Sequence, residues 1–403
     1  MHHLSLPHFI SRHVTGREES LFRRDLDDNR EALERAIQGK SVLVIGGAGS
    51  IGSSYIRALL PYRPGRLCVV DTNENGLTEL TRDLRSRSGL PVPADYLSYP
   101  VNFAEPVFEK IWRREGPFDI VANFAAHKHV RSEKDQYAIE AMVDNNVLKA
   151  RQLLELLAQR PPEHFFCVST DKAANPVNVM GATKKLMEEL VLAYAGQLHA
   201  TTARFANVAF SNGSLPAGFL ERLAKGQPLS APADVRRYFV SPEESGEICL
   251  LACLLGRPGE IFFPRLEEAG MKTFSGIALD LLEELGYEPL LCSSEEEARA
   301  AMSACAGTRR WPVYCFSSDT SGEKAFEEFH TGEEEVDWGR FAALGVICNA
   351  PRRPVAEVSA CCDALSALFR RETVTKADIV ELLSSLIPSF EHLETGRNLD
   401  NKM

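Results

Sequence analysis

Residues 41–52 read SVLVIGGAGSIG, and this stretch decides the fold. Apolar and β-branched residues at its start predict a short buried strand, and the apolar run Ile51–Leu60 predicts a helix directly after it. The turn between them is rich in glycine, with Gly46, Gly49 and Gly52 spaced as G-x-x-G-x-x-G. Glycines at this spacing let the backbone turn tightly between a strand and a helix. The stretch therefore predicts the first strand–turn–helix unit of an alternating α/β fold.

The same turn is suited to a phosphate group. Its backbone can approach a pyrophosphate closely, and the helix entered through Ser50 and Ile51 offers free N–H groups and the positive end of its dipole. The next predicted strand, 67–71, ends in Asp71, nineteen residues after Gly52. A carboxylate there accepts hydrogen bonds from ribose hydroxyls and repels a 2′-phosphate, so we predict NAD rather than NADP. The alternative is a glycine turn that binds nothing, with Asp71 as an ordinary turn residue.

Four further positions are expected to border the cofactor. Asn102 follows the run 96–101 and could meet the adenine. Phe124, Ala125 and Ala126 end a predicted strand, where small residues would let a dinucleotide pass. All four could equally be packing residues.

Strands and helices alternate along the first half of the chain. This alternation predicts βαβ units and an α/β fold with a doubly wound parallel sheet, covered by helices on both faces. After about residue 212 the pattern loosens, which predicts a smaller substrate-binding lobe from which some chain returns to the sheet. Thr375–Asp378 fits a capping box before 379–386, in a stretch that reads as a helical extension. The expected units are an N-terminal arm and helix (1–38), an NAD-binding domain (39–212), the smaller lobe (213–332) and a helical C-terminal extension (333–403). Residues 1–20 are polar and mixed, which predicts a loosely held arm. The expected strands are 41–45, 67–71, 118–124, 165–169 and 201–208, and the expected helices are 21–38, 51–60, 78–87, 138–157 and 184–195.

Composition restricts the function classes. The chain has 403 residues, a net charge of -11 and no long basic block, which disfavours a nucleic-acid partner. Its ten cysteines form no C-x-x-C pair and its ten histidines show no metal-ligand spacing, so we expect reduced thiols and no metal. The start of the chain lacks a signal pattern, and the longest strongly apolar run, 248–255, is too short to span a bilayer. We therefore expect a soluble, cytoplasmic protein without a membrane partner.

A second informative stretch, 169–172, reads STDK, and Lys184 follows it twelve residues after Lys172. The predicted strand 165–168 should deliver this stretch to the carboxyl edge of the sheet, where ligands bind in doubly wound folds. The carboxylate of Asp171 and two amines would then share one cleft with a bound cofactor, as acid–base chemistry requires. The alternative is that Asp171 and Lys172 are exposed loop charges.

Position 180 bears on the type of chemistry. Short-chain dehydrogenases usually place a tyrosine four residues before the lysine that corresponds to Lys184, and this chain has Met180 there. A methionine can neither donate nor accept a proton, whereas Asp171 and Lys172 supply an acid and an amine side by side. This exchange points away from plain alcohol oxidation and toward oxidation coupled to elimination.

Several segments together resemble the sugar-nucleotide 4,6-dehydratases, the UDP-N-acetylglucosamine branch of the extended short-chain dehydrogenase family. The resemblance covers about residues 40–330, with the motifs in the same order as in the family. The arm and the C-terminal extension lie outside it. The segments are 168–184 (VSTDKAANPVNVMGATK), 124–133 (FAAHKHVRSE), 204–219 (RFANVAFSNGSLPAGF), 237–239 (RYF) with Glu244, and 322–328 (GEKAFEE).

The resemblance implies a nucleotide-sugar substrate, most simply UDP-N-acetylglucosamine, and a 4-keto-6-deoxy product. Hydride removal from C4 makes the C5 hydrogen acidic; a base then takes this proton, an acid protonates the departing C6 hydroxyl, and hydride returns to C6. We expect Lys172, with a pKa lowered by nearby Lys184 and a closed pocket, to take the C5 proton. We expect Asp171 to serve the C6 oxygen. Because of Met180, the base for the C4 hydroxyl stays open between Thr170 in a relay, Asp171 and water.

The resemblance also implies which residues hold the substrate. The sugar is expected beside Lys128, His129 and Glu133, and the nucleotide beside Asn207, Ser214, Arg237 and Glu323. Arg237 is the expected diphosphate clamp because a guanidinium binds phosphate bidentately, with Arg236 as the alternative contact. Glu133 could instead belong to a charge cluster at a helix start, and Arg204 could be a structural ion-pair residue.

Two competing functions and one assembly remain open at this level. A 4-epimerase of the same fold would be expected to carry a tyrosine at position 180, and a non-catalytic NAD-binding regulator could dispense with Asp171, Lys172 and Lys184. A homodimer or higher homo-oligomer is expected, with the helices at 138–157 and 184–195 as candidate interfaces. Their apolar faces could equally pack inside the chain.

Overall fold

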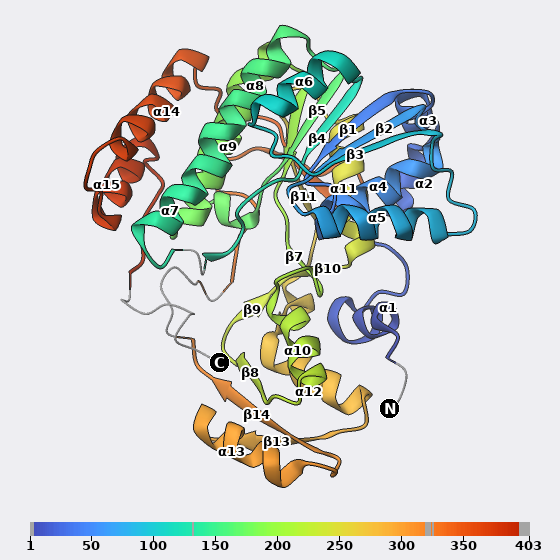
Figure 1. Ribbon diagram of the computed structural model, residues 1–403, viewed down its shortest axis with the longest axis vertical. Coiled ribbons are helices and arrows are strands. Elements are labelled where there is room, and N and C mark those ends of the chain that lie inside the picture. Colours follow the sequence, from blue (N-terminus) through green and yellow to red (C-terminus); the bar gives the residue numbers. More distant parts are fainter. Residues whose placement is uncertain (1–3, 131–132, 319–323, 325, 395–403) are drawn as a thin grey trace.

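A nine-stranded sheet forms the centre of the larger lobe of the computed structural model, which describes residues 4–130, 133–318, 324 and 326–394 (Figure 1). The strand order is β3-β2-β1-β4-β5-β6-β11-β16-β15, parallel from β3 to β11 and antiparallel at β16 and β15. This confirms the predicted doubly wound α/β fold, whose chain order reverses between β1 and β4. The strands are β1 (Ser41–Ile45), β2 (Arg66–Val70), β3 (Asp95–Tyr99), β4 (Ile120–Asn123), β5 (His164–Val168), β6 (Ala200–Ala203), β11 (Ile261–Pro264), β15 (Val336–Asp337) and β16 (Leu344–Ile347).

The strand register places the predicted motifs at one edge. Ile45 at the end of β1 pairs with Val70 of β2 and with Asn123 of β4. The glycine turn, Asp71 and Phe124 therefore leave the sheet at the same level, and in parallel sheets this carboxyl edge is where ligands bind.

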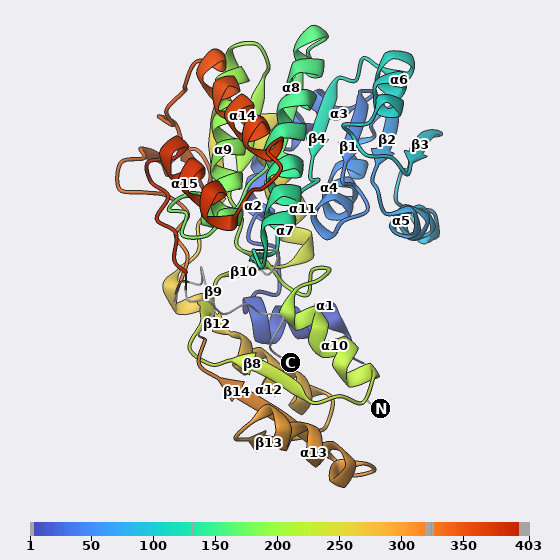
Figure 2. The same cartoon turned by 60° about the vertical axis from the view of Figure 1, so that its left-hand side comes forward.

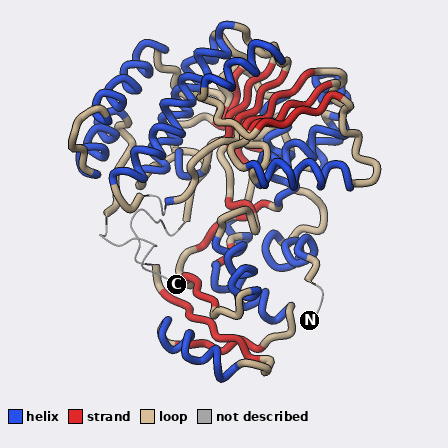
Figure 3. Tube along the Cα trace, viewed as in Figure 1, coloured by secondary structure: helices blue, strands red, loops and turns tan. Residues whose placement is uncertain are grey.

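Helices cover both faces of the sheet (Figures 1 and 3). Successive strand residues point to opposite faces and nearly all are apolar, so both faces must be buried. Val42 and Val44 pack into the layer of α4 and α11, whereas Leu43 and Ile45 pack into the layer of α8 and α9. The first layer contains α3 (Arg30–Ile37), α4 (Ser50–Leu59), α5 (Glu74–Ser86) and α11 (Pro242–Leu255). The second layer contains α6 (Pro106–Glu115), α7 (Gln136–Val143), α8 (Lys149–Gln159) and α9 (Val179–Ala193).

Two predicted helices differ from the observed ones in ways that matter for the site. The helix expected at 138–157 is interrupted by a π-helical turn, Asp144–Leu148, between α7 and α8. The helix expected from Lys184 begins five residues earlier, at Val179, because Asn178 caps it by accepting a hydrogen bond from Gly181 N. Met180 and Lys184 therefore lie one turn apart on the same helix.

A smaller lobe lies below the carboxyl edge of the sheet (Figure 1). Its parallel three-stranded sheet is flanked by helices, and two short strand pairs link it to the larger lobe. The three strands are β8 (Leu229–Pro232), β13 (Glu288–Cys292) and β14 (Arg310–Phe316), and the helices are α10 (Leu215–Ala224), α12 (Phe274–Glu284) and α13 (Glu295–Cys305). The linking pairs are β7 (Asn207–Val208) with β10 (Phe239–Val240), and β9 (Arg236–Arg237) with β12 (Lys272–Thr273).

The N-terminal arm is packed, not loosely held as its polar sequence suggested. Phe9, Ile10 and Val14 are buried in the apolar core of the smaller lobe, and Phe22 is buried in that of the larger lobe. The expected single helix at 21–38 is split at Asn29 into two. The arm elements are α1 (Leu6–Phe9), the π-helical η1 (Ile10–Thr15), α2 (Arg23–Asp28) and α3.

The C-terminal region is only partly helical. Residues 336–347 form β15 and β16, and the helices begin later, as α14 (Val355–Phe369) and α15 (Lys376–Leu386). The predicted capping box is present, since Thr375 and Asp378 each bond the other's backbone N–H. Both helices pack on α9, α14 also contacts the π-helical turn and α15 contacts α7 (Figure 2). Part of the surface that the sequence offered as a homodimer interface thus contacts α14 and α15 of the same chain.

Within the described ranges, none of the helices is both long and apolar enough to cross a membrane.

Candidate functional site

The glycine turn after β1 forms a backbone cradle. Gly46 has φ +74°, and a Cβ there would lie 2.6 Å from Ala125 N, so the turn can sit directly against the chain leaving β4 only if this residue is glycine. Gly52 packs so closely on Gly46 that a side chain would collide with its carbonyl oxygen. At Gly49, by contrast, an added Cβ would meet only Gly46 O, at 3.3 Å. The far side of Gly49 is therefore left open beside the start of α4.

Asp71 is built into this turn. Its carboxylate accepts hydrogen bonds from Ala48 N at 3.0 Å and from Asn73 N at 2.9 Å. Both bonds come from the backbone, so the side chain ties the glycine turn to the end of β2. Contact with a ribose, which the sequence predicts, would use the remaining lone pairs of the same oxygens.

The other expected cofactor residues divide into two groups. The ring of Phe124 packs against Tyr55 and Phe166, with centroids 5.1 and 5.8 Å away, so its side chain belongs to the core. Only backbone near Phe124 and Ala125 faces the glycine turn, and Ala126 is half-buried just beyond it. At Asn102, the side-chain oxygen caps the loop after β3 by accepting from Ala104 N at 3.0 Å.

The start of α4 is joined to the smaller lobe. Ser50 Oγ accepts a hydrogen bond from Asn212 N at 2.8 Å, and Ile51 is half-buried against the core. The turn that forms the cradle is thereby linked to the segment that carries Asn207 and Ser214.

Asp171 and Lys172 lie together at the carboxyl edge, in a short 3₁₀ turn after β5. Asp171 is buried, and its Oδ1 accepts from Thr170 Oγ1 at 2.8 Å, from Lys172 N at 2.9 Å and from Lys172 Nζ at 3.0 Å. The two side chains are therefore not exposed loop charges. Ser169 points elsewhere, donating to Glu188 Oε1 at 2.6 Å.

A carboxylate that the sequence analysis did not single out completes this corner. Glu327, which is 4% exposed, has Oε1 3.8 Å from Lys172 Nζ and 4.0 Å from a guanidinium nitrogen of Arg237. Burial raises the pKa of Glu327, the charges of Lys172 and Arg237 oppose this rise, and Asp171 adds to it. Its motif was visible in the sequence, but its approach to Asp171 and Lys172 depends on tertiary structure.

The charge state of Lys172 corrects the sequence-based expectation. Burial lowers the pKa of Lys172, but the carboxylates of Asp171 and Glu327 outweigh this effect and leave the pKa raised. A lowered pKa, with Lys184 as its cause, was predicted. In this arrangement Lys172 is an ammonium at neutral pH rather than a free amine.

Lys184 has the lowered pKa instead. It is buried, and this burial lowers the pKa of its amine against the opposing influence of Cys167 and Glu188. Its Nζ donates to Val168 O at 2.6 Å, directly below the 3₁₀ turn. Met180, on the preceding turn of α9, is also buried.

Asn146 is a further polar residue beside the site that the sequence analysis missed. It lies in the π-helical turn, is buried, and its side chain bonds His127 N at 2.8 Å, His127 O at 2.9 Å and Thr183 Oγ1 at 3.1 Å. It thereby joins the loop after β4 to α9 beside Lys184. The available signal was a polar Asp-Asn-Asn run within an apolar helix, and π-helical turns are frequent at functional sites.

The expected sugar-side residues lie on the loop after β4. Lys128 and His129 are exposed there, and a Cβ added at Gly213 would lie 3.0 Å from the His129 ring. Glu133, in contrast, is buried and accepts a hydrogen bond from Val179 N at 2.8 Å and another from His392 Nε2. These contacts agree with the alternative expectation, in which Glu133 belongs to a charge cluster at a helix start.

On the nucleotide side, Asn207 stands out. Among the described residues its buried Nδ2 has no hydrogen-bond partner, which leaves a donor for a ligand. Ser214 caps α10, accepting from Ala217 N at 3.4 Å. Glu323 lies outside the described residues.

The two candidate arginines differ in placement. Arg237 is 5% exposed and donates to the backbone oxygens of Arg236 and Lys324, both at 2.9 Å. The side chain of Arg236 is 47% exposed and reaches toward Glu268. Arg237 lies beside Glu327, so of the two arginines it is the better placed to hold a diphosphate in this corner. Arg204 is the structural residue that the sequence allowed for, since it pairs with Glu188 and Glu334.

A possible metal cluster is already neutralised by a cation. Glu133, His392 and Glu394 could place ligand atoms within 4.8 Å of one another. Lys376 Nζ, however, donates to Glu394 and to the backbone oxygen of Glu133. Its ammonium therefore supplies the positive charge that a metal ion would bring.

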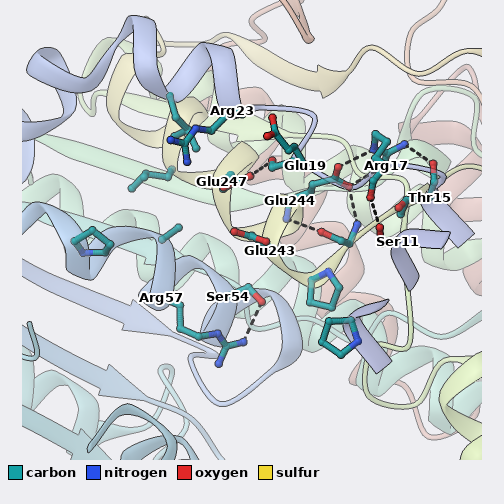
Figure 4. A pocket seen from close by; sticks show the side chains of 18 of the residues that line it. Ser11, Thr15, Arg17, Glu19, Arg23, Ser54, Arg57, Glu243, Glu244 and Glu247 are labelled. Carbon is teal, nitrogen blue, oxygen red and sulfur yellow. Dashed lines mark hydrogen bonds and ion pairs between the residues drawn. The ribbon is translucent and has the colours of Figure 1, made fainter. Parts of the chain in front are cut away.

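A separate cavity of about 730 Å³ lies between the N-terminal arm and helices α4 and α11 (Figure 4). Arg17 clamps buried Glu244 through two hydrogen bonds of 2.7 Å and also donates to Phe239 O at 3.1 Å. Nearby, the Ser20 hydroxyl donates to Glu247, and burial raises the pKa of Glu247 from 4.5 to about 7. These contacts lie away from the glycine cradle and from the corner that holds Asp171, Lys172 and Glu327, which we call the catalytic corner because of its proposed role.

The chain belongs to the polysaccharide biosynthesis protein family, whose model matches residues 42–343. The match contains the cradle, the Asp171–Lys172 corner and Glu327. The N-terminal arm (1–38) and the helices α14 and α15 lie outside it.

Three curated relatives illustrate the range of similarity. An uncharacterized membrane protein of Methanocaldococcus jannaschii is 34% identical over 62% of this chain and 74% of its own length. A probable polysaccharide biosynthesis protein of Bacillus subtilis is 27% identical over 80% of this chain, and the alignment spans only 52% of that longer protein. A UDP-N-acetylglucosamine 4,6-dehydratase (inverting) of Campylobacter jejuni is 28% identical over 57% of this chain and 67% of its own length. UDP-glucose 4-epimerases of Rickettsia match as well, at 26% identity.

Solved structures share the fold at low sequence identity. Pen from Bacillus thuringiensis superimposes with a TM-score of 0.63 and 18% identity, covering 87% of this chain and 98% of Pen. DesIV, a dTDP-glucose 4,6-dehydratase from Streptomyces venezuelae solved with NAD bound, gives 0.55 and 19%, covering 81% of this chain and 96% of DesIV.

Proposed function

We propose that this protein is an NAD-dependent sugar-nucleotide 4,6-dehydratase that acts on UDP-N-acetylglucosamine. The observation that carries this proposal is the buried Asp171–Lys172 pair at the carboxyl edge, where only β4 separates its strand, β5, from β1, which enters the glycine cradle. The Campylobacter relative, named for this reaction, supports the choice of substrate. The absence of a tyrosine at position 180 supports elimination over simple oxidation.

The residues around the cradle fit a dinucleotide with a 2′-hydroxyl. The open side of Gly49 and the N-terminus of α4 would receive the pyrophosphate, and Asp71 would receive the ribose. Bound NAD would supply reversible hydride acceptance. Lys184 donates to Val168 O and to Met187 Sδ, so its ammonium keeps one further N–H donor for the nicotinamide ribose.

Asp171 and Lys172 would act as one acid–base unit. Their 3.0 Å hydrogen bond lets a proton pass between them, so that one partner accepts the C5 proton while the other protonates the departing C6 hydroxyl. The resting proton lies on Lys172. For Lys172 to take the C5 proton, as the sequence suggested, its own proton must first pass to Asp171, which then delivers it to the C6 oxygen. Glu327 places a second carboxylate near the Lys172 ammonium. It can stabilise the pair whether the proton lies on Lys172 or on Asp171.

Binding of the nucleotide half would use donors from both lobes. Asn207 offers its unpartnered amide, and Arg237 offers a guanidinium that is already oriented by two backbone carbonyls. A site that aligns the sugar carbons with Asp171 requires this kind of fixed anchor for the diphosphate.

The runner-up is a 4-epimerase of the same fold, because epimerases also occur among the relatives. The two reactions share C4 oxidation and differ in the fate of the 4-keto intermediate. An epimerase needs no acid at C6, so the Asp171–Lys172 pair favours the dehydratase.

Mass spectrometry of the reaction with UDP-N-acetylglucosamine tests the proposal. We expect the nucleotide sugar to lose one water with no net reduction of NAD, and Asp171→Asn to abolish this change. A product of unchanged mass would indicate an epimerase. No turnover of any tested nucleotide sugar, with NAD bound, would favour a regulator.

A further inference from the structure

The C-terminal segment 387–394 lies against the loop that joins the two halves of the catalytic corner. This loop, 174–178, runs from the 3₁₀ turn that carries Asp171 and Lys172 to the first residue of α9, which carries Met180 and Lys184. The position of Lys172 relative to Lys184 therefore depends on how firmly this short loop is held.

Backbone hydrogen bonds hold the loop from one side. Glu391 N donates to Pro176 O at 3.2 Å, and Leu393 N donates to Val177 O at 2.9 Å. Donors two residues apart on one segment bond successive carbonyls on the other, so the two backbones lie side by side without the regular spacing of a β-ladder. The other side of the loop is held by the segment that carries Glu327, since Lys324 Nζ donates to Asn175 O at 2.8 Å.

Side chains strengthen the same junction. Glu133 Oε2 accepts from Val179 N at 2.8 Å, and Val179 is the first residue of α9, whose N–H has no partner within the helix. The other oxygen of Glu133 accepts from His392 Nε2. A carboxylate at a helix N-terminus is favoured by the helix dipole, and His392 fixes it there.

The segment is anchored by apolar packing. Ile379, Leu383, Ile387 and Phe390 are buried in the same core as Val179 and Leu186 of α9. The stretch that contacts the loop therefore follows directly on a packed helix and is itself anchored by Ile387 and Phe390. It also lies outside the residues that the family model matches, so it is an addition to the catalytic core.

We propose that the C-terminal segment 387–394 is part of the active-site frame, with His392 and Glu133 as positioning residues that fix the loop between Lys172 and α9. Its effect on turnover rests on the proposed dehydratase function, but its effect on the loop does not.

Hydrogen–deuterium exchange on the full-length protein without ligands tests the contact directly. In His392→Ala, Glu133 loses the bond from His392, and we expect amides 177–180 to exchange about tenfold faster, the equivalent of one hydrogen bond to a charged group. His392→Gln, which keeps an N–H donor, should restore protection. Leu393→Ala is the matched control, because it removes an exposed side chain and keeps the N–H that bonds Val177.

Steady-state kinetics provide the second measurement. We expect His392→Ala to lower kcat about tenfold, to leave the KM for NAD unchanged, and to recover in His392→Gln. Unchanged exchange at 177–180 in His392→Ala would overturn the proposal, and so would faster exchange spread evenly over the whole chain. If the wild-type protein turns over no nucleotide sugar, the proposed function fails while the exchange experiment still decides this inference.

Discussion

Two buried clusters of charge in this molecule differ in how completely their hydrogen bonds are used. In the cluster beneath the arm, Glu244 accepts from Arg17, from Leu21 N and from Ser241 N, so its oxygens are saturated by the protein (Figure 4). In the catalytic corner, Glu327 approaches its cations only to 3.8 and 4.0 Å, and the neighbouring Asn207 amide has an unused donor. Burial of charge is common to both clusters. Spare bonding capacity at the carboxyl edge supports our proposal that the corner is the active site, whereas saturation of the other cluster supports a structural role for it.

The largest expected effect is in the catalytic corner. Lys172→Met would leave Asp171 and Glu327 without their shared cation and remove half of the acid–base unit. We expect turnover of UDP-N-acetylglucosamine to fall by about 10³-fold or more, with NAD still bound. Lys225→Met, at an exposed lysine, is the control and should keep full activity. Retained turnover in Lys172→Met would remove this lysine from the chemistry.

The arm cluster should respond in stability instead. Arg17→Met leaves the buried carboxylate of Glu244 unpaired, and we expect the free energy of unfolding to fall by about 3 kcal/mol. Arg23→Met, which removes an exposed helix pair with Asp27, should cost less than about 0.5 kcal/mol. Urea unfolding measures both. The comparison fails if Arg17→Met is as stable as the control, or if the folded variant loses turnover as Lys172→Met does.

A smaller effect is expected at Glu247, whose pKa is raised from 4.5 to about 7 by burial. Between these values the folded protein keeps a proton that the unfolded chain has lost, so stability falls as pH rises through this window. Glu247→Gln should remove this dependence and raise the free energy of unfolding by about 2 kcal/mol at about pH 8. Thermal unfolding across this range measures it, and an equal pH dependence in the variant would contradict the assignment.

The smallest effect concerns the alkaline side of the rate profile. Because the pKa of Lys172 lies above its ordinary 10.5, an ammonium-bearing corner predicts a level kcat/KM between about pH 7 and 9. The raised pKa of Glu327 places the acid limb above 4.5. A kcat/KM that climbs about tenfold per pH unit over the same range would show that a free amine is needed and that ligands do not displace its proton.

Local patterns were enough for the fold and for part of the site. The glycine spacing, the strand before it and Asp71 after it could be predicted because each depends on residues close in sequence. Asp171 and Lys172 were found because a predicted strand ends just before them. Their environment was not, since the pKa of Lys172 is raised by the carboxylate of Asp171 together with that of Glu327, which approaches from more than 150 residues away.

Other features depended on tertiary contacts from the start. Asn146 acts from a π-helical turn, which leaves no clear periodicity signal. The arm reads as polar and loose, but Arg17 finds Glu244 across 227 positions of sequence. Helices α14 and α15 pack on the helices that the sequence offered as a dimer interface. The sequence predicted a helical extension there, but not which surface it packs on.

Deuterium at C4 of the substrate gives the most direct test of the central claim. With UDP-N-acetylglucosamine labelled at C4, the account predicts a product that has lost one water and carries the deuterium at C6, because the hydride taken from C4 is returned there. Label that stays at C4 in a product of unchanged mass would contradict the account, and so would label that accumulates on the cofactor.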